Sequence, residues 1–99
     1  MARFDIYPNP DGEGYLLDVQ ADILVYLRSR VVVPLQPKAV AHIPMARLNP
    51  VIEVDGSEMV MMTHFLSAVP TSILQAPLAN LEPQRDVILD AMDFLQQGF

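Results

Sequence analysis

A single stretch of this chain, residues 82–99, has the periodicity of an α-helix, and it comes at the end. Pro83 suits the first helical turn, where a missing N–H costs nothing. One face of this helix is apolar and the opposite face is acidic, as in a helix that packs on a core. The apolar face comprises Val87, Ile88, Ala91, Met92 and Leu95, and the acidic face Glu82, Asp86, Asp90 and Asp93. The chain then ends on Phe99, which we expect either to pack into the protein or to contact a partner.

The residues before this helix form short β-prone runs separated by turn formers. Residues 4–7 and 15–20 are typical of strands, and residues 8–14 between them carry prolines and glycines, so the three together predict a hairpin with a wide loop. The three consecutive valines of residues 31–33 predict a strand that is buried on both faces, or that has one face covered by another subunit. Pro34 predicts that this strand ends there or lies at the edge of a sheet.

The clearest hairpin lies in the middle of the chain. Asp55-Gly56 is a favoured two-residue turn, and β-prone residues flank it over residues 51–63. Residues 36–50 are rich in proline and predict an irregular excursion, whereas residues 71–74 predict another short strand. Strands followed by one helix, without β-α-β alternation, predict a mainly antiparallel β fold with one C-terminal α-helix, in a single domain of residues 1–99.

The composition limits the functions open to this chain. Apolar residues make up 52% of its 99 residues, which suggests that a second subunit covers part of its surface. The formal net charge of −6 argues against non-specific binding of nucleic acid, which needs a surplus of Lys and Arg. Without cysteine the chain has no disulfide, thiol nucleophile or zinc–cysteine site, and we expect it to be cytoplasmic. No window is long and apolar enough to cross a bilayer, so we expect no membrane contact.

Side chains that carry chemistry are few and scattered. The sequence has no phosphate loop, no metal-ligand spacing and no nucleophile elbow, so we expect neither an enzyme nor a cofactor or metal. We interpret His42 as structural rather than as a ligand. Asp18 and Asp22 flank Gln20, and paired carboxylates can perform acid–base chemistry, but no histidine or serine lies nearby in the sequence. An aspartate that caps the end of a strand is the simpler interpretation.

Short segments spread over nearly the whole chain match one family pattern. They are residues 4–7, 17–23, 30–35, 48–52, 55–57, 61–63, 68–70, 73–74 and 79–81, followed by Gly98-Phe99 at the end. The combination of Asp-Val-Gln-x-Asp-Ile, Val-x-Pro-Leu, Met-Met-Thr and Ala-Val-Pro, in this order, is the specific part. In this combination the chain resembles the CcdB family, the toxin component of plasmid and chromosomal toxin–antitoxin modules.

The resemblance implies a fold, partners and a mode of action. It implies a small SH3-like barrel, shared by CcdB and MazF-type toxins, that ends in one helix and forms a homodimer. It implies a toxin that supports plasmid maintenance by binding the DNA gyrase A subunit and trapping gyrase on cleaved DNA. It further implies a cognate CcdA-like antitoxin that neutralises the toxin, and no cofactor.

The resemblance also implies two sets of binding residues. The residues facing gyrase would be Ile23, Leu24, Asp93, Gln96, Gln97, Gly98 and Phe99. The residues covered by the antitoxin would be Asn9, Pro10, Asp11, Gly12 and Glu13 at the hairpin tip, with Ala41, His42, Ile43 and Arg47 in the later loop. The only basic patch, Arg28-Ser29-Arg30, is a further candidate partner for an acidic segment of the antitoxin.

The chain departs from the family pattern at its end, and three functions stay open. The family has a tryptophan immediately before the terminal glycine, where this chain has Gln97, and an amide makes neither the packing nor the cation–π contact of an indole. Gln96 replaces an aromatic residue and Asp93 replaces an asparagine. The three functions are a gyrase-binding toxin, a degenerate or retargeted homologue that still binds antitoxin, and a MazF-like endoribonuclease. The acidity of the chain counts against the ribonuclease.

Overall fold

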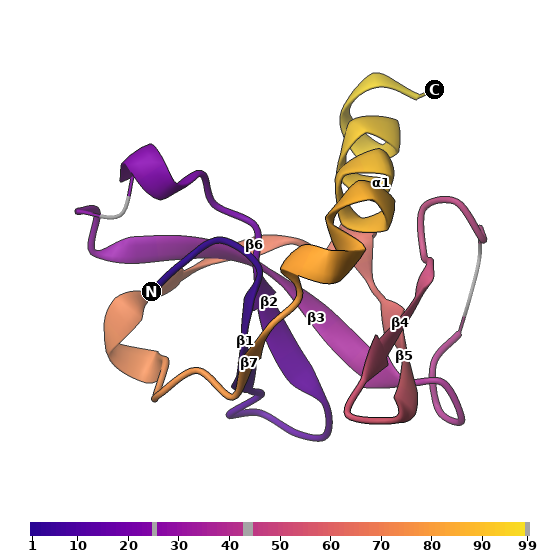
Figure 1. Cartoon of the computed structure of the whole chain (residues 1–99), viewed down its shortest axis with the longest axis horizontal. Coiled ribbons are helices and arrows are strands. Elements are labelled where there is room, and N and C mark those ends of the chain that lie inside the picture. The colour runs from indigo at the N-terminus through magenta and orange to yellow at the C-terminus, as the bar shows by residue number, and fades with distance from the viewer. Residues whose placement is uncertain (25, 43–44, 99) are drawn as a thin grey trace.

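The structure is a computed structural model of the whole chain, and its description covers residues 1–24, 26–42 and 45–98 (Figure 1). Within those residues, seven strands form one antiparallel sheet and a single α-helix follows them. The strands are β1 (Asp5–Pro8), β2 (Tyr15–Asp18), β3 (Ser29–Pro37), β4 (Val51–Val54), β5 (Ser57–Met61), β6 (Ser67–Pro70) and β7 (Ala79–Asn80), and the helix is α1 (Arg85–Gln97). The predicted class, a mainly antiparallel β fold with one C-terminal helix, is confirmed.

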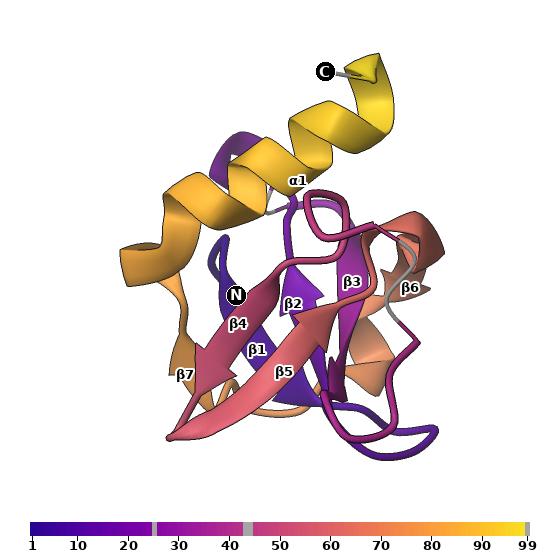
Figure 2. The same cartoon turned by 90° about the vertical axis from the view of Figure 1, so that its right-hand side faces the viewer.

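The sheet is built around its longest strand, β3. One edge of β3 pairs with β2, and the other edge pairs first with β6 and then with β5. The strand order is β4-β5-β3-β2-β1-β7, so β4 and β7 are the two outer strands. The sheet curls into a half-barrel, and α1 lies across one end of it (Figure 2).

The position of Pro34 corrects a prediction made from the sequence. β3 neither ends at Pro34 nor lies at an edge, because it continues to Pro37 in the centre of the sheet. The carbonyl oxygen of Val31 accepts the N–H of Val19, so the backbone polar groups of Val31 point toward β2 and its extension. Successive residues of a strand point these groups to alternate sides, so those of Pro34, three residues later, point away from β2. On that far side, pairing with β6 ends at Val32 and pairing with β5 begins at Leu35. Pro34 lies between these two paired segments, so its missing N–H removes no hydrogen bond to either β5 or β6.

Both faces of β3 are buried, as one of the two interpretations of the valine run predicts. Val33 faces a large core enclosed by the half-barrel and α1, and Val32 faces a smaller core on the outer side of the sheet. The large core includes Ile6, Leu17, Val33, Leu35, Ile52, Met61, Ile88 and Ala91, and the small one Tyr7, Leu16, Val32 and Leu74. Alternate side chains of one strand therefore serve two cores.

Two turns follow the sequence predictions. The loop of residues 9–14 joins β1 to β2 as a hairpin. Asp55 and Gly56 join β4 to β5, with φ of 51° and 80°, the positive values that this two-residue turn requires. The earlier hairpin closes at Gly14, whose φ is 90°.

The stretch after β5 differs from the predicted strands. Thr63–Phe65 forms a 3₁₀ turn (η2) before β6, and Thr71–Ile73 forms another (η3) in place of the predicted strand. The N–H of Leu74 bonds to Thr71, so the chain turns instead of extending, and Leu74 is carried into the small core. A short apolar run does not distinguish these outcomes in the sequence.

The helix begins with a 3₁₀ turn at Glu82–Gln84 (η4), which contains Pro83, and ends at Gln97. Ile88 and Ala91 are buried in the large core, and Met92 packs against it. Val87 and Leu95, predicted for the same apolar face, are 47% and 37% exposed. The stripe of α1 that contacts the half-barrel is therefore narrower than the apolar face in the sequence.

Candidate functional site

The end of α1 is an exposed surface that projects from the half-barrel (Figure 1). Asp93, Gln96, Gln97 and Gly98 are all exposed there. Gly98 has φ 79° and its N–H bonds to the carbonyl oxygen of Phe94 at 2.9 Å, so a left-handed glycine stops the helix and redirects the chain. Phe99 lies outside the described residues, and the choice between a packed and a presented side chain stays a prediction.

Ile23 and Leu24 lie on a second projection. They belong to a 3₁₀ turn, Asp22–Leu24 (η1), and Ile23 is 81% exposed. Tyr26 and Leu27, a few residues further on, are exposed as well. Figure 1 shows η1 and the end of α1 on opposite sides of the molecule, so a single chain does not bring the two parts of the predicted gyrase surface together.

The predicted antitoxin residues of the β1–β2 hairpin gather around one hollow. Asn9 orders the tip, because its Oδ1 accepts the N–H of Asp11 at 2.9 Å. A pocket of about 430 Å³ lies beside the tip, between it and the end of β3. It is lined by Asn9, Asp11, Gly12, Glu13, Gln36, Pro37 and Val40. Pro10 is exposed at the same tip but is not among the lining residues.

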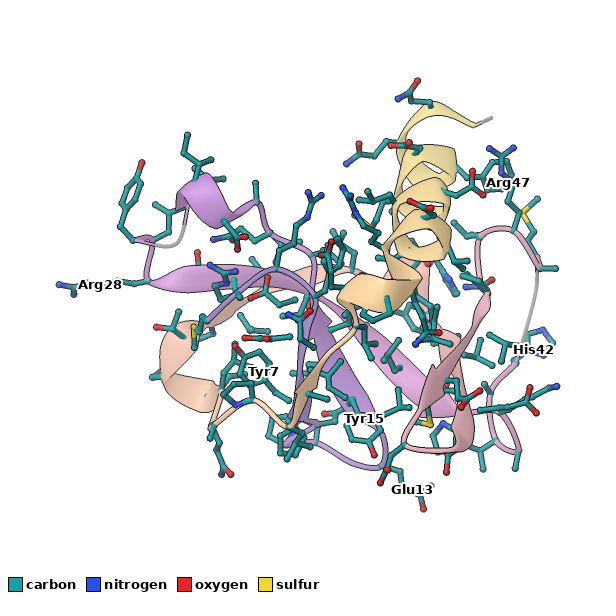
Figure 3. The ribbon with its side chains drawn as sticks, in the orientation of Figure 1. Tyr7, Glu13, Tyr15, Arg28, His42 and Arg47 are labelled. Atoms are coloured by element: carbon teal, nitrogen blue, oxygen red, sulfur yellow. The ribbon has the colours of Figure 1, made fainter. Side chains whose placement is uncertain are left out.

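The later predicted loop divides between two places. Ala41 is half-buried, and its N–H donates to the carbonyl oxygen of Pro37, which places it beside the pocket. His42 is exposed at the side of the molecule (Figure 3). Ile43 lies outside the described residues. The pocket is also lined by Gln36, Pro37 and Val40, which no sequence pattern had indicated as site residues. The only local feature of the sequence that could have indicated this side of the pocket is Val40, an apolar residue in a proline-rich segment.

Arg47 lies away from the hairpin tip, against α1 (Figure 3). Its Nε and Nη2 each lie 3.1 Å from a different carboxylate oxygen of Asp90, a bidentate ion pair. Its guanidinium also lies 4.8 Å from the ring centroid of Phe94. Arg47 therefore joins the loop assigned to the antitoxin to the helix assigned to gyrase, a link that no local sequence pattern indicated.

The basic patch is split by burial. Arg28 projects into solvent (Figure 3), whereas Arg30 is fully buried beside Asp18. The Nε of Arg30 donates to Asp18 Oδ2 at 2.6 Å, and the N–H of Gln20 donates to the other carboxylate oxygen. Arg30 is thus an internal counter-ion, and the suggestion that it pairs with an antitoxin is wrong.

This buried cluster brings acid–base groups together inside the protein. Burial raises the pKa of Asp18, while the Gln20 N–H and Arg30 oppose the shift. Burial and the negative charges of Asp5 and Asp18 raise the pKa of the Tyr7 phenol from 10.0 to about 12. Asp18, Arg30 and Tyr7 have no exposed surface, so the cluster offers no entry for an RNA substrate. Its role is structural.

Within the described ranges, no group of three or more His, Asp or Glu residues is placed to hold a metal ion. The same ranges contain no helix with the length and apolar character needed to cross a membrane. The exposed surfaces that carry predicted site residues are the end of α1, the apolar projection at η1 and the hollow at the hairpin tip.

A sequence model of the family described as CcdB protein matches residues 3–98, which is nearly the whole chain. The chain belongs to the CcdB family. CcdB membership identifies it as a toxin of the toxin–antitoxin class, and CcdB proteins act without enzymatic activity. For this CcdB protein, antitoxin and gyrase are the kinds of partner that the family implies in general.

Proposed function

We propose that this CcdB protein is a homodimeric type II toxin that binds the DNA gyrase A subunit through the end of α1 and traps gyrase on cleaved DNA. The observation that carries the proposal is the exposed helix end, where Gly98 stops the helix in a left-handed conformation. Exposed side chains on a rigid helix, followed by a residue that redirects the chain, suit insertion into a pocket of a partner. The contact would be made by Asp93, Gln96, Gln97, Gly98 and Phe99 at the helix end, together with Ile23 and Leu24 at η1.

The apolar projection supports the dimer. Ile23 is 81% and Tyr26 76% exposed, and Leu24 and Leu27 lie beside them. Exposed apolar side chains of this kind are unfavourable in water and are typical of contact with a partner. In the proposed dimer, η1 of one subunit lies near the helix end of the other, which would complete a surface that one chain leaves divided.

The hollow at the hairpin tip is the proposed antitoxin site. Asp11 and Glu13 place negative charge at its rim, and Val40 offers an apolar wall. An antitoxin segment bound over residues 9–13 and 41–43 would lie close in the chain to Arg47, whose other contacts are Asp90 and Phe94 on α1. Displacement of Arg47 would loosen its contact with the helix that gyrase binds, which supplies a physical route to neutralisation.

A second function is favoured by Gln97. An exposed glutamine replaces the aromatic anchor of the family, and the loss of such an anchor costs about 1–3 kcal/mol at a buried interface. A degenerate or retargeted toxin that keeps antitoxin binding without poisoning gyrase is therefore the alternative.

Supercoiling by purified gyrase, followed as relaxed plasmid converts to supercoiled plasmid, separates the two. Four proteins are compared: the chain itself, a variant lacking residues 98–99, Gln97→Trp, and Gln75→Ala as an exposed glutamine substitution away from the helix. Inhibition by the chain and by Gln75→Ala, abolished by the deletion, supports gyrase poisoning. Inhibition by Gln97→Trp alone supports a toxin that has lost its anchor. No inhibition by any of the four contradicts gyrase as the target.

Growth arrest on overexpression gives the cellular counterpart. The gyrase proposal expects arrest by the full chain and none by the variant lacking residues 98–99. Equal arrest by both would place the toxic surface elsewhere, and no arrest with intact antitoxin binding would favour the degenerate toxin. Cleavage of single-stranded RNA by the purified chain would contradict both.

A further inference from the structure

The two outer strands of the sheet, β4 and β7, face each other across a groove. Each pairs with another strand on one side only within the described chain, β4 with β5 and β7 with β1. A pocket of about 450 Å³ lies between them. We call it the seam groove, and the side chains used below are Ile6, Tyr15, Glu53, Val54, Asp55 and Leu78. None of them belongs to the proposed gyrase or antitoxin surfaces.

The side chain of Gln84 closes one end of the seam groove. Gln84, in η4, accepts the N–H of Glu53 at 3.0 Å and donates to the carbonyl oxygen of Glu53 at 2.8 Å. Its amide thus makes the two hydrogen bonds that a neighbouring strand would make to the outer edge of β4. From Glu53 to Asp55 the groove continues past this bridge toward the turn, with Leu78 and β7 on its other wall.

The groove combines an apolar floor with an acidic rim. Ile6 and Val54 are buried at its base, and Tyr15, half-buried, lies between the start of β2 and the β4–β5 hairpin (Figure 3). Leu78 is 58% exposed on the wall formed by the β7 side. Glu53 and Asp55 are both exposed, and none of the lining residues is basic. This surface favours a ligand with apolar side chains and positive charge.

We propose that the seam groove binds an extended segment of a partner protein that alternates apolar and basic side chains. The segment adds as a strand along the outer edge of β7, because backbone groups at a free sheet edge pair with a peptide backbone. In an extended segment successive side chains point to opposite faces. The apolar side chains pack on Ile6, Val54 and Leu78, and the basic ones lie over Glu53 and Asp55. This site is independent of the proposed function.

Titration of the ¹⁵N-labelled full chain with a synthetic peptide tests the proposal. The probe is a seven-residue peptide of alternating lysine and valine with blocked ends, followed by ¹H–¹⁵N correlation spectra. Binding is expected to shift the amide signals of Val54, Asp55 and Ala79 and to give contacts between peptide and Ala79 protons. The same peptide with glutamate in place of lysine is expected to bind at least fivefold more weakly.

Three variants distinguish the groove from general attraction to an acidic protein. Glu53→Gln with Asp55→Asn keeps the turn, since Asn-Gly is also favoured there, and is expected to weaken binding at least fivefold. Leu78→Ser leaves the charge unchanged and is expected to weaken binding at least threefold. Asp22→Asn with Asp86→Asn removes the same number of exposed charges elsewhere and is expected to change binding less than twofold.

Each variant must give the dispersed spectrum of the folded chain, which separates loss of the site from loss of the fold. Equal weakening by the groove variant and by the Asp22/Asp86 control would overturn the proposal, because it would show attraction to charge alone. Amide shifts confined to residues outside the groove would also overturn it. No binding at millimolar peptide would do the same.

Discussion

Arg47 and Asp90, which are 43 residues apart in the sequence, form a bidentate ion pair whose two N–O distances are both 3.1 Å. The pair ties the β3–β4 connection to α1, and the guanidinium also lies over Phe94. It joins the loop that carries Arg47 to the helix whose end is the proposed gyrase surface. Both side chains are about half exposed, which limits the stability that the pair contributes.

Arg47→Lys is expected to lower the free energy of unfolding by about 0.5–1 kcal/mol. Lysine keeps the positive charge but loses the bidentate pairing with Asp90 and the planar guanidinium that lies over the ring of Phe94. Urea denaturation measures the loss. In a double-mutant cycle with Asp90→Asn, we expect a coupling energy that falls when the salt concentration is raised to about 1 M. Arg85→Lys, whose pair with Glu82 is 3.5 Å long within one helical turn, serves as control. A coupling energy of zero at low salt would contradict the link.

Gly14→Ala is expected to lower the free energy of unfolding by about 2–4 kcal/mol. Gly14 has φ 90°, and a Cβ there would overlap the carbonyl oxygen of Leu35 on the neighbouring strand. Gly12→Ala in the same loop is the matched control, because its Cβ would meet nothing within 4 Å, and we expect a change below about 0.5 kcal/mol. Thermal and urea unfolding of both variants give the comparison, and equal effects would mean that the loop adapts at Gly14.

Gln84→Ala is expected to destabilise the chain by about 0.5–1.5 kcal/mol, because both hydrogen bonds to the backbone of Glu53 are lost. Gln84→Glu keeps the acceptor and loses the donor, so its effect should be intermediate. Hydrogen exchange of the Glu53 amide should accelerate in the alanine variant, since its acceptor is gone. Gln75→Ala removes an exposed glutamine elsewhere and should leave both quantities unchanged. An unchanged exchange rate in Gln84→Ala would rule out the bridge in solution.

Tyr7 gives a prediction at alkaline pH. Its pKa is raised from 10.0 to about 12 in the folded chain, so the unfolded chain loses this proton first as the pH rises. The stability that depends on the neutral phenol is present below pH 10 and is lost as the pH approaches 12, by about 2–3 kcal/mol in total. Relative to wild type, Tyr7→Phe should therefore become more stable over this interval.

Urea denaturation at pH 8, 10 and 11 measures this difference. At pH 8 the loss of the hydroxyl should change stability by less than about 1 kcal/mol, because the buried oxygen has no hydrogen-bond partner among the described residues. Tyr26→Phe, which removes the hydroxyl of a largely exposed tyrosine, is the matched control. Parallel loss of stability in wild type and Tyr7→Phe would mean that Tyr7 is not the group that titrates.

Structural elements that depend only on neighbouring residues could be predicted from the sequence. Asp55-Gly56 specifies its turn through the φ values that the two residues tolerate, and the structure has both of them positive. The valine run specifies a strand buried on two faces, because alternate side chains point to opposite sides. The amphipathic pattern specifies α1, although only part of its apolar face is covered. The family motifs predicted a chain of this class before any contact was known.

Candidate sites were predictable only as segments. The sequence predicted the hairpin tip and the loop of residues 41–47 as one site, whereas the side chain of Arg47 packs against α1. It offered Arg28 and Arg30 as one patch, whereas burial separates them. In both cases the missing information was the path of the chain between the residues, which sets what each long side chain can reach.

The sequence by itself determined the fold class, the two hairpin connections, the final helix and membership of the CcdB family, because propensity, periodicity and motifs act over a few neighbouring residues. Only the tertiary structure decided that Pro34 fits in a central strand, that Asp18 neutralises Arg30 inside the protein, and that Gln84 closes the seam at Glu53. Each of these depends on which backbone groups and charges distant segments bring within hydrogen-bond distance. That geometry is a property of the whole folded chain, and no local pattern carries it.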